Sequence, residues 1–187
     1  MKQETREKLI DSAFNTFYRQ GYQGANIASI LKEVNINKGS MYHYFKSKKE
    51  LGLAVVDERI RQNIKDKYQS ILKSKTPYQT LFETLRLSPD TLIYGCPLNK
   101  MSQEMVYIDE EFNKLLSSVY EDFEKSISQI LNKAIEVGEI PSCTPNITAR
   151  LIISTYEGAL MIYHLNRDRG HYNAVIDELE RQFNHLA

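Results

Sequence analysis

Residues 26–45 read Asn-Ile-Ala-Ser-Ile-Leu-Lys-Glu-Val-Asn-Ile-Asn-Lys-Gly-Ser-Met-Tyr-His-Tyr-Phe, and this stretch decides the fold. Asn26 can cap a short helix whose apolar residues recur at helical spacing. Asn35 then stands where the chain needs a residue that tolerates a left-handed turn, and Asn37 can cap a second short helix. Two short helices joined by a tight turn make a helix-turn-helix, so the stretch predicts that motif.

The second of these helices carries more polar groups than packing requires. Gly39 lies in its first turn, where glycine costs about 1 kcal/mol relative to alanine, so the close approach of another backbone, such as a phosphate strand, would explain it. Around it stand donors that suit phosphates and base edges. They belong to Asn37, Lys38, Ser40, Tyr42, His43 and Tyr44. For Tyr42 and Tyr44, simple aromatic packing is the alternative interpretation.

Helical periodicity continues along almost the whole chain, and strand patterns are nearly absent. A helix over about residues 5–20 precedes the motif and ends at Gly21, a residue suited to a left-handed stop. Capping residues and prolines predict further helices at about 47–72, from 77, from 88, and at about 109–138, 145–168 and 172–186. The fold class expected is therefore all-α, with about nine helices.

The charge of the chain is unevenly distributed although its net value is zero. Residues 1–50 hold nine basic and five acidic residues, and the remainder holds fifteen and nineteen. The basic N-terminal segment and the acidic remainder indicate that residues 1–50 bind a polyanion, although a solvated protein surface can carry the same excess of charge. There is no apolar signal segment and no run of membrane-spanning length, so we expect a cytoplasmic protein without membrane contact.

Motifs of enzymes and metal sites are missing from the sequence. There is no glycine-rich phosphate loop, no nucleophile elbow and no paired His–Glu metal motif. The histidines at 43, 164, 171 and 185 are too scattered for ligand spacing, and two cysteines are too few for a disulfide framework. We therefore expect no catalytic residue, no metal and no cofactor.

Residues 5–51 resemble the DNA-binding domain of the TetR family of bacterial repressors. The resemblance rests on Gly21-Tyr22 and on the run Ile-Asn-Lys-Gly-Ser-Met-Tyr-His-Tyr-Phe-Lys-Ser-Lys-Lys-Glu-Leu at 36–51. Asn26 stands where the family usually has Thr or Ser, and Asn35 where it usually has Gly; both substitutes keep the cap and the turn. The resemblance implies a DNA-binding domain over 1–50 and a helical ligand-binding and dimerisation domain over 51–187.

The same resemblance implies a role for each residue of the motif, with double-stranded operator DNA as the partner. Lys38, Gly39, Ser40 and His43 would face the major groove. Phosphates would be held by Tyr42, Tyr44 and Lys48, the last at a helix N-terminus that also offers Ser47 and Lys49. The expected DNA-binding set is Asn26, Ser29, Asn37, Lys38, Gly39, Ser40, Tyr42, His43, Tyr44 and Lys48.

The second domain is expected to form a homodimer, because the last two helices of this family usually make an interface between subunits. Gly158 and Ala159 would let a partner helix come close, or they accommodate a neighbour within the chain. The domain is also rich in Tyr and Met, which suits a pocket for a small apolar or aromatic inducer, although ordinary core is the alternative. The pocket candidates are Tyr94, Cys96, Met101, Tyr120, Phe123, Tyr156 and Tyr163.

Cys96 leaves more than one function open. The segment Tyr-Gly-Cys-Pro-Leu at 94–98 resembles a Gly-Cys-x-Leu segment of some family members, so Cys96 is either a sensor of electrophiles or oxidants or a small buried hydrophobe. The function expected is that of a repressor that binds a palindromic operator as a homodimer and is released by a small molecule. The alternatives are an electrophile- or redox-sensing repressor, a ligand-independent DNA-binding protein, and an activator.

Overall fold

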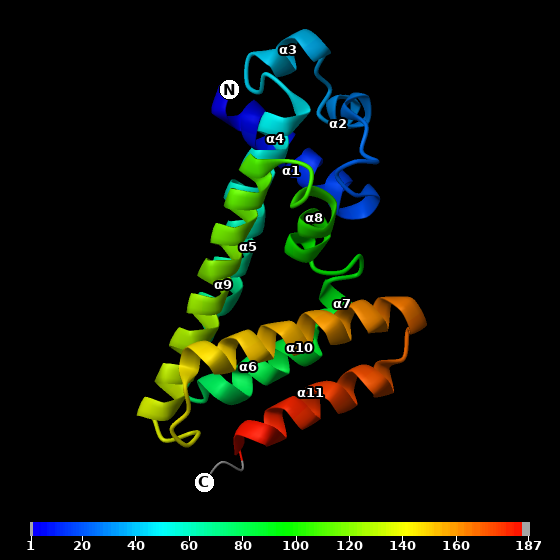
Figure 1. Cartoon of the computed structure of the whole chain (residues 1–187). Coiled ribbons are helices and arrows are strands. Elements are labelled where there is room, and N and C mark those ends of the chain that lie inside the picture. Colours follow the sequence, from blue (N-terminus) through cyan, green and yellow to red (C-terminus); the bar gives the residue numbers. More distant parts are fainter. Residues whose placement is uncertain (1, 185–187) are drawn as a thin grey trace. The chain divides into compact units, whose positions relative to one another are not determined.

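The regular structure is entirely helical in residues 2–184, the part of the chain that the computed structural model describes (Figure 1). The elements are α1 (Lys2–Gln20), α2 (Ile27–Glu33), α3 (Lys38–Tyr42), α4 (Lys48–Val55), the π-helix η1 (Val56–Ile60), α5 (Arg61–Ile71), α6 (Pro77–Arg86), α7 (Ser88–Thr91), α8 (Pro97–Met105), α9 (Glu110–Glu136), α10 (Pro145–Asn166) and α11 (Arg169–Asn184). The all-α prediction is confirmed. Residues 185 and 186, which the last predicted helix included, lie outside the described part.

One helix of the described part was not predicted. The segments α4, η1 and α5 follow one another without a break, so they count as one helix and bring the total to ten, against the nine expected. The additional helix is α8, which starts at Pro97 and buries Leu98, Met101 and Met105 on one face. A proline at the first helical position is a start signal that could have revealed it.

Most of the predicted helix boundaries have the expected chemistry. The side-chain oxygens of Asn26 and Asn37 accept from the backbone N–H groups of Ala28 and Ser40, each at 2.8 Å. Asn35 adopts a left-handed conformation, with φ of 54°. Each cap satisfies a backbone N–H group at the start of α2 or α3, helices that are too short to be stable alone.

The chain divides into two compact units. The first contains the residues up to Asn63 together with Pro97–Val119, and the second contains Ile64–Cys96 and Tyr120 onward. The first unit therefore includes α8 in addition to the helix-turn-helix. Because these units describe packing and not activity, the functional boundary at residue 50 stays a prediction.

The helix that follows the motif is not a regular α-helix. Its turn at Val56–Ile60 is a π-helix, a form that occurs often at functional positions. In the first unit this turn is tied to α1 by ion pairs, with Arg6 binding Glu58 at 2.5 Å and Arg59 binding Asp11 at 2.5 Å. The helix predicted over about 47–72 is therefore confirmed as one continuous helix, with a π-helical turn at these five residues.

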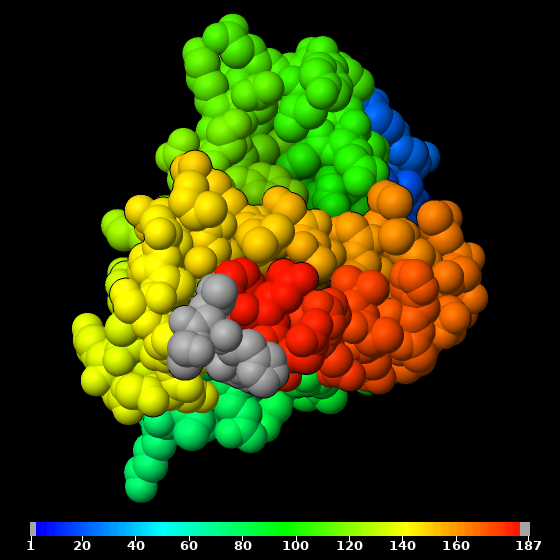
Figure 2. Space-filling model, turned by 60° about the horizontal axis from the view of Figure 1, so that its bottom comes forward, coloured from blue at the N-terminus to red at the C-terminus, as the bar shows by residue number. Residues whose placement is uncertain are grey.

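The second unit is built around α10. Its helix α11 lies beside α10, and α6 lies against α11 (Figures 1 and 2). Large side chains fill the space between them, since Tyr78, Phe82, Tyr156 and Tyr172 are each at most 2% exposed. None of the helices over residues 2–184 is both long and apolar enough to cross a membrane.

Candidate nucleic-acid interface and effector site

The helix-turn-helix is held by a small apolar core. Ile30 of α2 and Met41 of α3 are buried, and the turn closes through the Ile36 N–H, which donates to the Leu31 carbonyl at 3.0 Å. This packing fixes α3 on the motif and leaves its other face to solvent.

The predicted DNA-binding residues in and beside α3 reach solvent, as do Asn26 and Ser29 at α2. Tyr42 is 50% exposed although its neighbour Met41 is only 2% exposed, so Tyr42 is not a core aromatic. Tyr44 is half-buried, which leaves both of its interpretations open. Exposed or half-exposed side chains are shared by Asn26, Ser29, Asn37, Lys38, Ser40, Tyr42, His43 and Tyr44. Their DNA roles stay predictions.

Gly39 lies in the first turn of α3, beside the capping residue Asn37. It is exposed, and a Cβ at this position would meet only the Asn37 side-chain oxygen, at 3.3 Å. A contact of that kind is tight but involves a surface side chain. That oxygen also caps α3 by accepting from the Ser40 N–H at 2.8 Å, so the glycine relieves crowding at the cap, and its DNA role stays a prediction.

The two lysines at the start of α4 are already engaged within the chain. Lys49 Nζ lies 2.7 Å from Asp109 Oδ2 and 3.0 Å from Glu111 Oε2. Lys48 Nζ donates to the carbonyl oxygen of Ala25 at 2.7 Å. A phosphate contact of Lys48 stays a prediction, and it would have to share the ammonium with this carbonyl.

A cluster of polar and ionisable groups lies inside the second unit. Lys67 of α5 has its Nζ 3.5 Å from Ser88 Oγ and 6.0 Å from the ring centre of Tyr156. The Tyr156 hydroxyl donates to Ser88 Oγ at 3.0 Å. Glu157, only 8% exposed, and Cys96 both interact electrostatically with Lys67. We call Lys67, Ser88, Cys96, Tyr156 and Glu157 the polar cluster.

Burial controls the ionisation of this cluster. Desolvation lowers the pKa of Lys67, although Cys96 and Glu157 oppose the shift. The pKa of Tyr156 is raised well above its usual range, first by burial. A buried glutamate such as Glu157 beside a half-buried lysine costs stability compared with well-packed apolar residues, so the pair is a candidate for a functional role.

The predicted pocket residues do not all belong to one place. Cys96 and Tyr156 belong to the polar cluster, and Tyr120 interacts electrostatically with its members. Phe123 packs on Tyr68 with ring centres 4.9 Å apart. The other three candidates lie differently: Met101 is in the first unit, Tyr94 is 42% exposed, and Tyr163 packs on Tyr172 at 5.9 Å.

Sequence reasoning missed Lys67, Ser88 and Glu157. A signal was present for Lys67, because it continues a helical series with Ile60, Ile64 and Ile71 and is the only charged member of it. Glu157 likewise interrupts an apolar stretch of α10. Among residues 2–184, no three His, Cys, Asp or Glu side chains gather as a metal ion would require.

Helix α10 presents a second apolar face to solvent. Ile147, Leu151, Met161 and Leu165 are 59%, 46%, 49% and 78% exposed and follow a helical spacing. Near the middle of the stripe lies Gly158, where no heavy atom comes within 4 Å of a Cβ position.

The glycine is therefore not explained by a neighbour within the chain. Ala159 differs, since it is 4% exposed and packs inside its own unit, so the expectation that it faces a partner helix is wrong. A groove of about 440 Å³ runs along the same side of α10, between Leu151 and Val175 of α11.

Comparison with known proteins agrees with this geometry. The family models for bacterial regulatory proteins of the tetR family and for the tetracyclin repressor-like C-terminal domain match residues 9–55 and 85–179. An uncharacterized HTH-type transcriptional regulator in the lacX 3′ region of Lactococcus lactis subsp. lactis is 30% identical over 185 residues, which cover 96% of this chain and 93% of the relative.

Two further comparisons concern a repressor of Escherichia coli. The HTH-type transcriptional repressor NemR of strain K12 is 24% identical over 75% of this chain and 71% of its own. The crystal structure of the reduced form of E. coli NemR has the same fold, with a TM-score of 0.83 and 20% identity over 95% of this chain and 96% of that one. This chain belongs to the TetR family and is a transcriptional regulator with a helix-turn-helix DNA-binding domain.

Proposed function

We propose that this regulator is a cytoplasmic repressor that binds a near-palindromic operator as a homodimer and is released by a small molecule. The observation that carries the proposal is the solvent face of α3, where Lys38, Ser40 and His43 are available to base edges and Tyr42 to phosphates. Nothing in the packing of the motif calls for this concentration of donors. A regulatory role is also supported over an enzymatic one, because the relatives reported above are regulators.

The apolar face of α10 supports the homodimer, with a second copy of this chain as its occupant. Its exposed side chains would lose their water contact against the same stripe of a partner. Gly158, with open space over it, would allow the two α10 helices to approach closely. Two copies also bring two recognition helices to one operator, as helix-turn-helix proteins require for half-sites about 34–36 Å apart.

The polar cluster supports an effector site in the second unit. It combines an ammonium, hydroxyls and a carboxylate with the aromatic rings around them, so it can hydrogen-bond a small molecule that carries polar groups on an apolar frame. Burial would make each of those contacts stronger than it is in water.

Selection of operator DNA from random duplexes tests the proposal. We expect one near-palindromic sequence, bound by a species of twice the 21.7 kDa chain mass in light scattering. Binding as a monomer, or equal affinity for selected and random DNA, would contradict it. Regulation is then read from a reporter gene behind the selected operator, where a repressor lowers expression and an activator raises it.

Release through Cys96 is a second candidate, favoured by its electrostatic interaction with Lys67. An ammonium beside a thiol favours the thiolate, which is the nucleophile. With N-ethylmaleimide, the Cys96 sulfur would bond to an alkene carbon as the double bond opens, and solvent would protonate the adjacent carbon.

The two half-buried cysteines provide matched variants for this candidate. We expect N-ethylmaleimide to release Cys143→Ser from its operator and to leave Cys96→Ser bound. Release of Cys96→Ser to the same extent would exclude the sensing role.

A further inference from the structure

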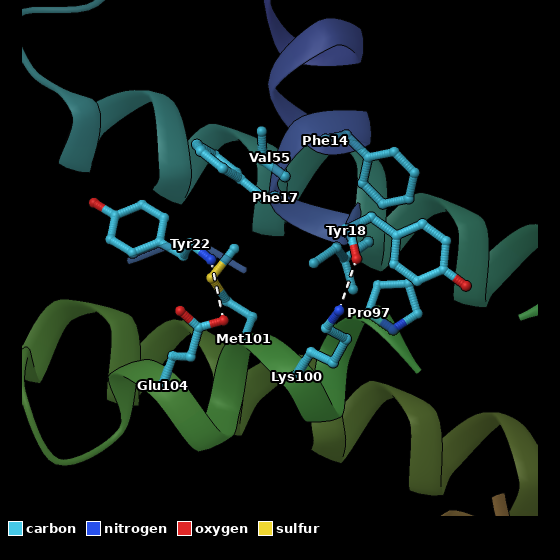
Figure 3. A pocket seen from close by; sticks show the side chains of 10 residues that line it. Phe14, Phe17, Tyr18, Tyr22, Val55, Pro97, Lys100, Met101 and Glu104 are labelled. Carbon is cyan, nitrogen blue, oxygen red and sulfur yellow. Dashed lines mark hydrogen bonds between the residues drawn. The ribbon is translucent and has the colours of Figure 1, made fainter. Parts of the chain in front are cut away.

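Two charged side chains of α8 form hydrogen bonds with the backbone at the end of α1 and in the turn that follows it (Figure 3). Lys100 Nζ donates to the backbone carbonyl of Tyr18 at 2.8 Å. One carboxylate oxygen of Glu104 accepts from the N–H of Tyr22 at 3.0 Å, and the other accepts from the N–H of Gln23 at 2.7 Å. Lys100 and Glu104 are four residues apart, so they lie on one face of the helix.

A third charge holds the same turn from α4. Lys48 Nζ donates to the carbonyls of Gln23 and Ala25 at 3.3 and 2.7 Å, so the N–H and the C=O of Gln23 are each bound by a charged group. Burial lowers the pKa of Lys48, and the nearby Glu104 carboxylate opposes that shift. We call Lys48, Lys100 and Glu104 the turn clamp.

The clamp matches the electrostatics of the turn. The C-terminal end of a helix carries partial negative charge on its last carbonyls, which suits the Lys100 ammonium. Beyond the helix, Gly21 is left-handed with φ of 78°, and the two N–H groups that follow point at Glu104. A carboxylate accepting two backbone N–H groups makes stronger bonds than a neutral acceptor would.

The surroundings of the clamp are closely packed. The cavity between α1 and α8, lined in part by Phe17, Pro97 and Met101, measures only about 10 Å³, which is room for one water at most (Figure 3). This junction therefore fixes geometry, and it is too small to bind an effector.

We infer that the turn clamp positions the DNA-reading motif, so that Glu104 and Lys100 of α8 and Lys48 of α4 are positioning residues for operator binding. The clamped turn leads within two residues of Ala25 into α2, whose packing in turn orients α3. The inference rests on the proposed operator binding and does not depend on the identity of the effector.

Glu104→Gln tests the inference in the full-length protein. The substitution keeps the size of the side chain but leaves one acceptor oxygen for two N–H groups. Gln103→Ala, at an exposed neighbouring position of α8, is the control. Affinity for the operator selected by the wild-type protein, and for a random duplex, is measured by fluorescence anisotropy at a temperature where all variants are folded by circular dichroism.

We expect Glu104→Gln to weaken operator binding about tenfold, to weaken random-duplex binding much less, and to speed hydrogen exchange at the Tyr22 and Gln23 amides, while Gln103→Ala changes none of these. A purely structural role would lower only the melting temperature and leave the affinity of the folded protein unchanged, which would overturn the inference. Failure of the wild-type protein to select any operator would instead refute sequence-specific binding itself.

The variant Lys48→Met tests the role of the turn clamp independently of Glu104. As a positioning residue, Lys48 should change operator affinity without changing the dependence on salt. A decrease of about one in the salt slope would instead show the phosphate contact that the family resemblance implies, and the loss of affinity would then not support a positioning role for Lys48.

Discussion

Substitution of Gly21 by alanine should lower the free energy of unfolding by an amount that depends on Glu104, and this dependence can be measured. At φ of 78° a side chain costs about 1–2 kcal/mol of backbone strain. The three heavy atoms nearest to an added Cβ all belong to the Glu104 carboxylate, the closest at 2.6 Å. The carboxylate must therefore move, and its two hydrogen bonds to backbone N–H groups must weaken or break.

The size of the effect follows from those two parts. If each lost hydrogen bond contributes about 1–1.5 kcal/mol, a cautious value for a half-buried carboxylate, Gly21→Ala should lower the free energy of unfolding by about 3–5 kcal/mol. In a Glu104→Ala background the hydrogen bonds are already absent. The same glycine substitution should then cost only the strain of about 1–2 kcal/mol.

Urea unfolding followed by circular dichroism, at one protein concentration, measures all four members of this cycle. Gly138→Ala is a matched control, because Gly138 has φ of 73° and no heavy atom within 4 Å of a Cβ position. Its cost should equal that of Gly21→Ala without Glu104. An equal cost of Gly21→Ala in both backgrounds would show that Glu104 and the turn are not coupled, and the reasoning would fail.

Three further predictions concern the other sites. Lys38→Ala should reduce discrimination between operator and random DNA by about 1–3 kcal/mol, and an equal loss on both duplexes would exclude base reading. Gly158→Leu should give monomers or misassembled protein in light scattering, whereas an intact dimer would show that the dimer interface does not include Gly158. Because burial lowers the pKa of Lys67, the stability of the wild type relative to Lys67→Met should rise as pH approaches 10.5; a flat difference would contradict the shift.

The helix-turn-helix could be predicted in detail because its signals are local. A cap such as Asn37 and a left-handed residue such as Asn35 act on backbone groups a few residues away, so their chemistry can be read from adjacent letters. The exposed face of α3 followed from the same spacing. Predicting the roles of these residues does not require the positions of residues that are distant in the sequence.

The clamp and the polar cluster could not be predicted in this way, because they depend on contacts distant in sequence. Glu104 accepts hydrogen bonds from N–H groups more than eighty residues earlier in the sequence, and Lys67 donates to Ser88, which is 21 residues later. Met101 was assigned to the pocket for its residue type alone, although it belongs to the first unit. Residue type gives chemistry, but only tertiary packing decides which groups share a site.

The short helices of the motif explain why such distant contacts can regulate DNA binding. Helices of seven and five residues, as α2 and α3 are, depend on their surroundings for a fixed orientation. Allosteric coupling between an effector and DNA typically amounts to about 1–3 kcal/mol, and two hydrogen bonds to a carboxylate supply a free energy of that size. If an effector weakened both of these hydrogen bonds, the free energy involved would be large enough for coupling of that size, and the recognition helix would not need to unfold. Operator DNA would then oppose the binding of that effector by the same free energy, because coupling is reciprocal.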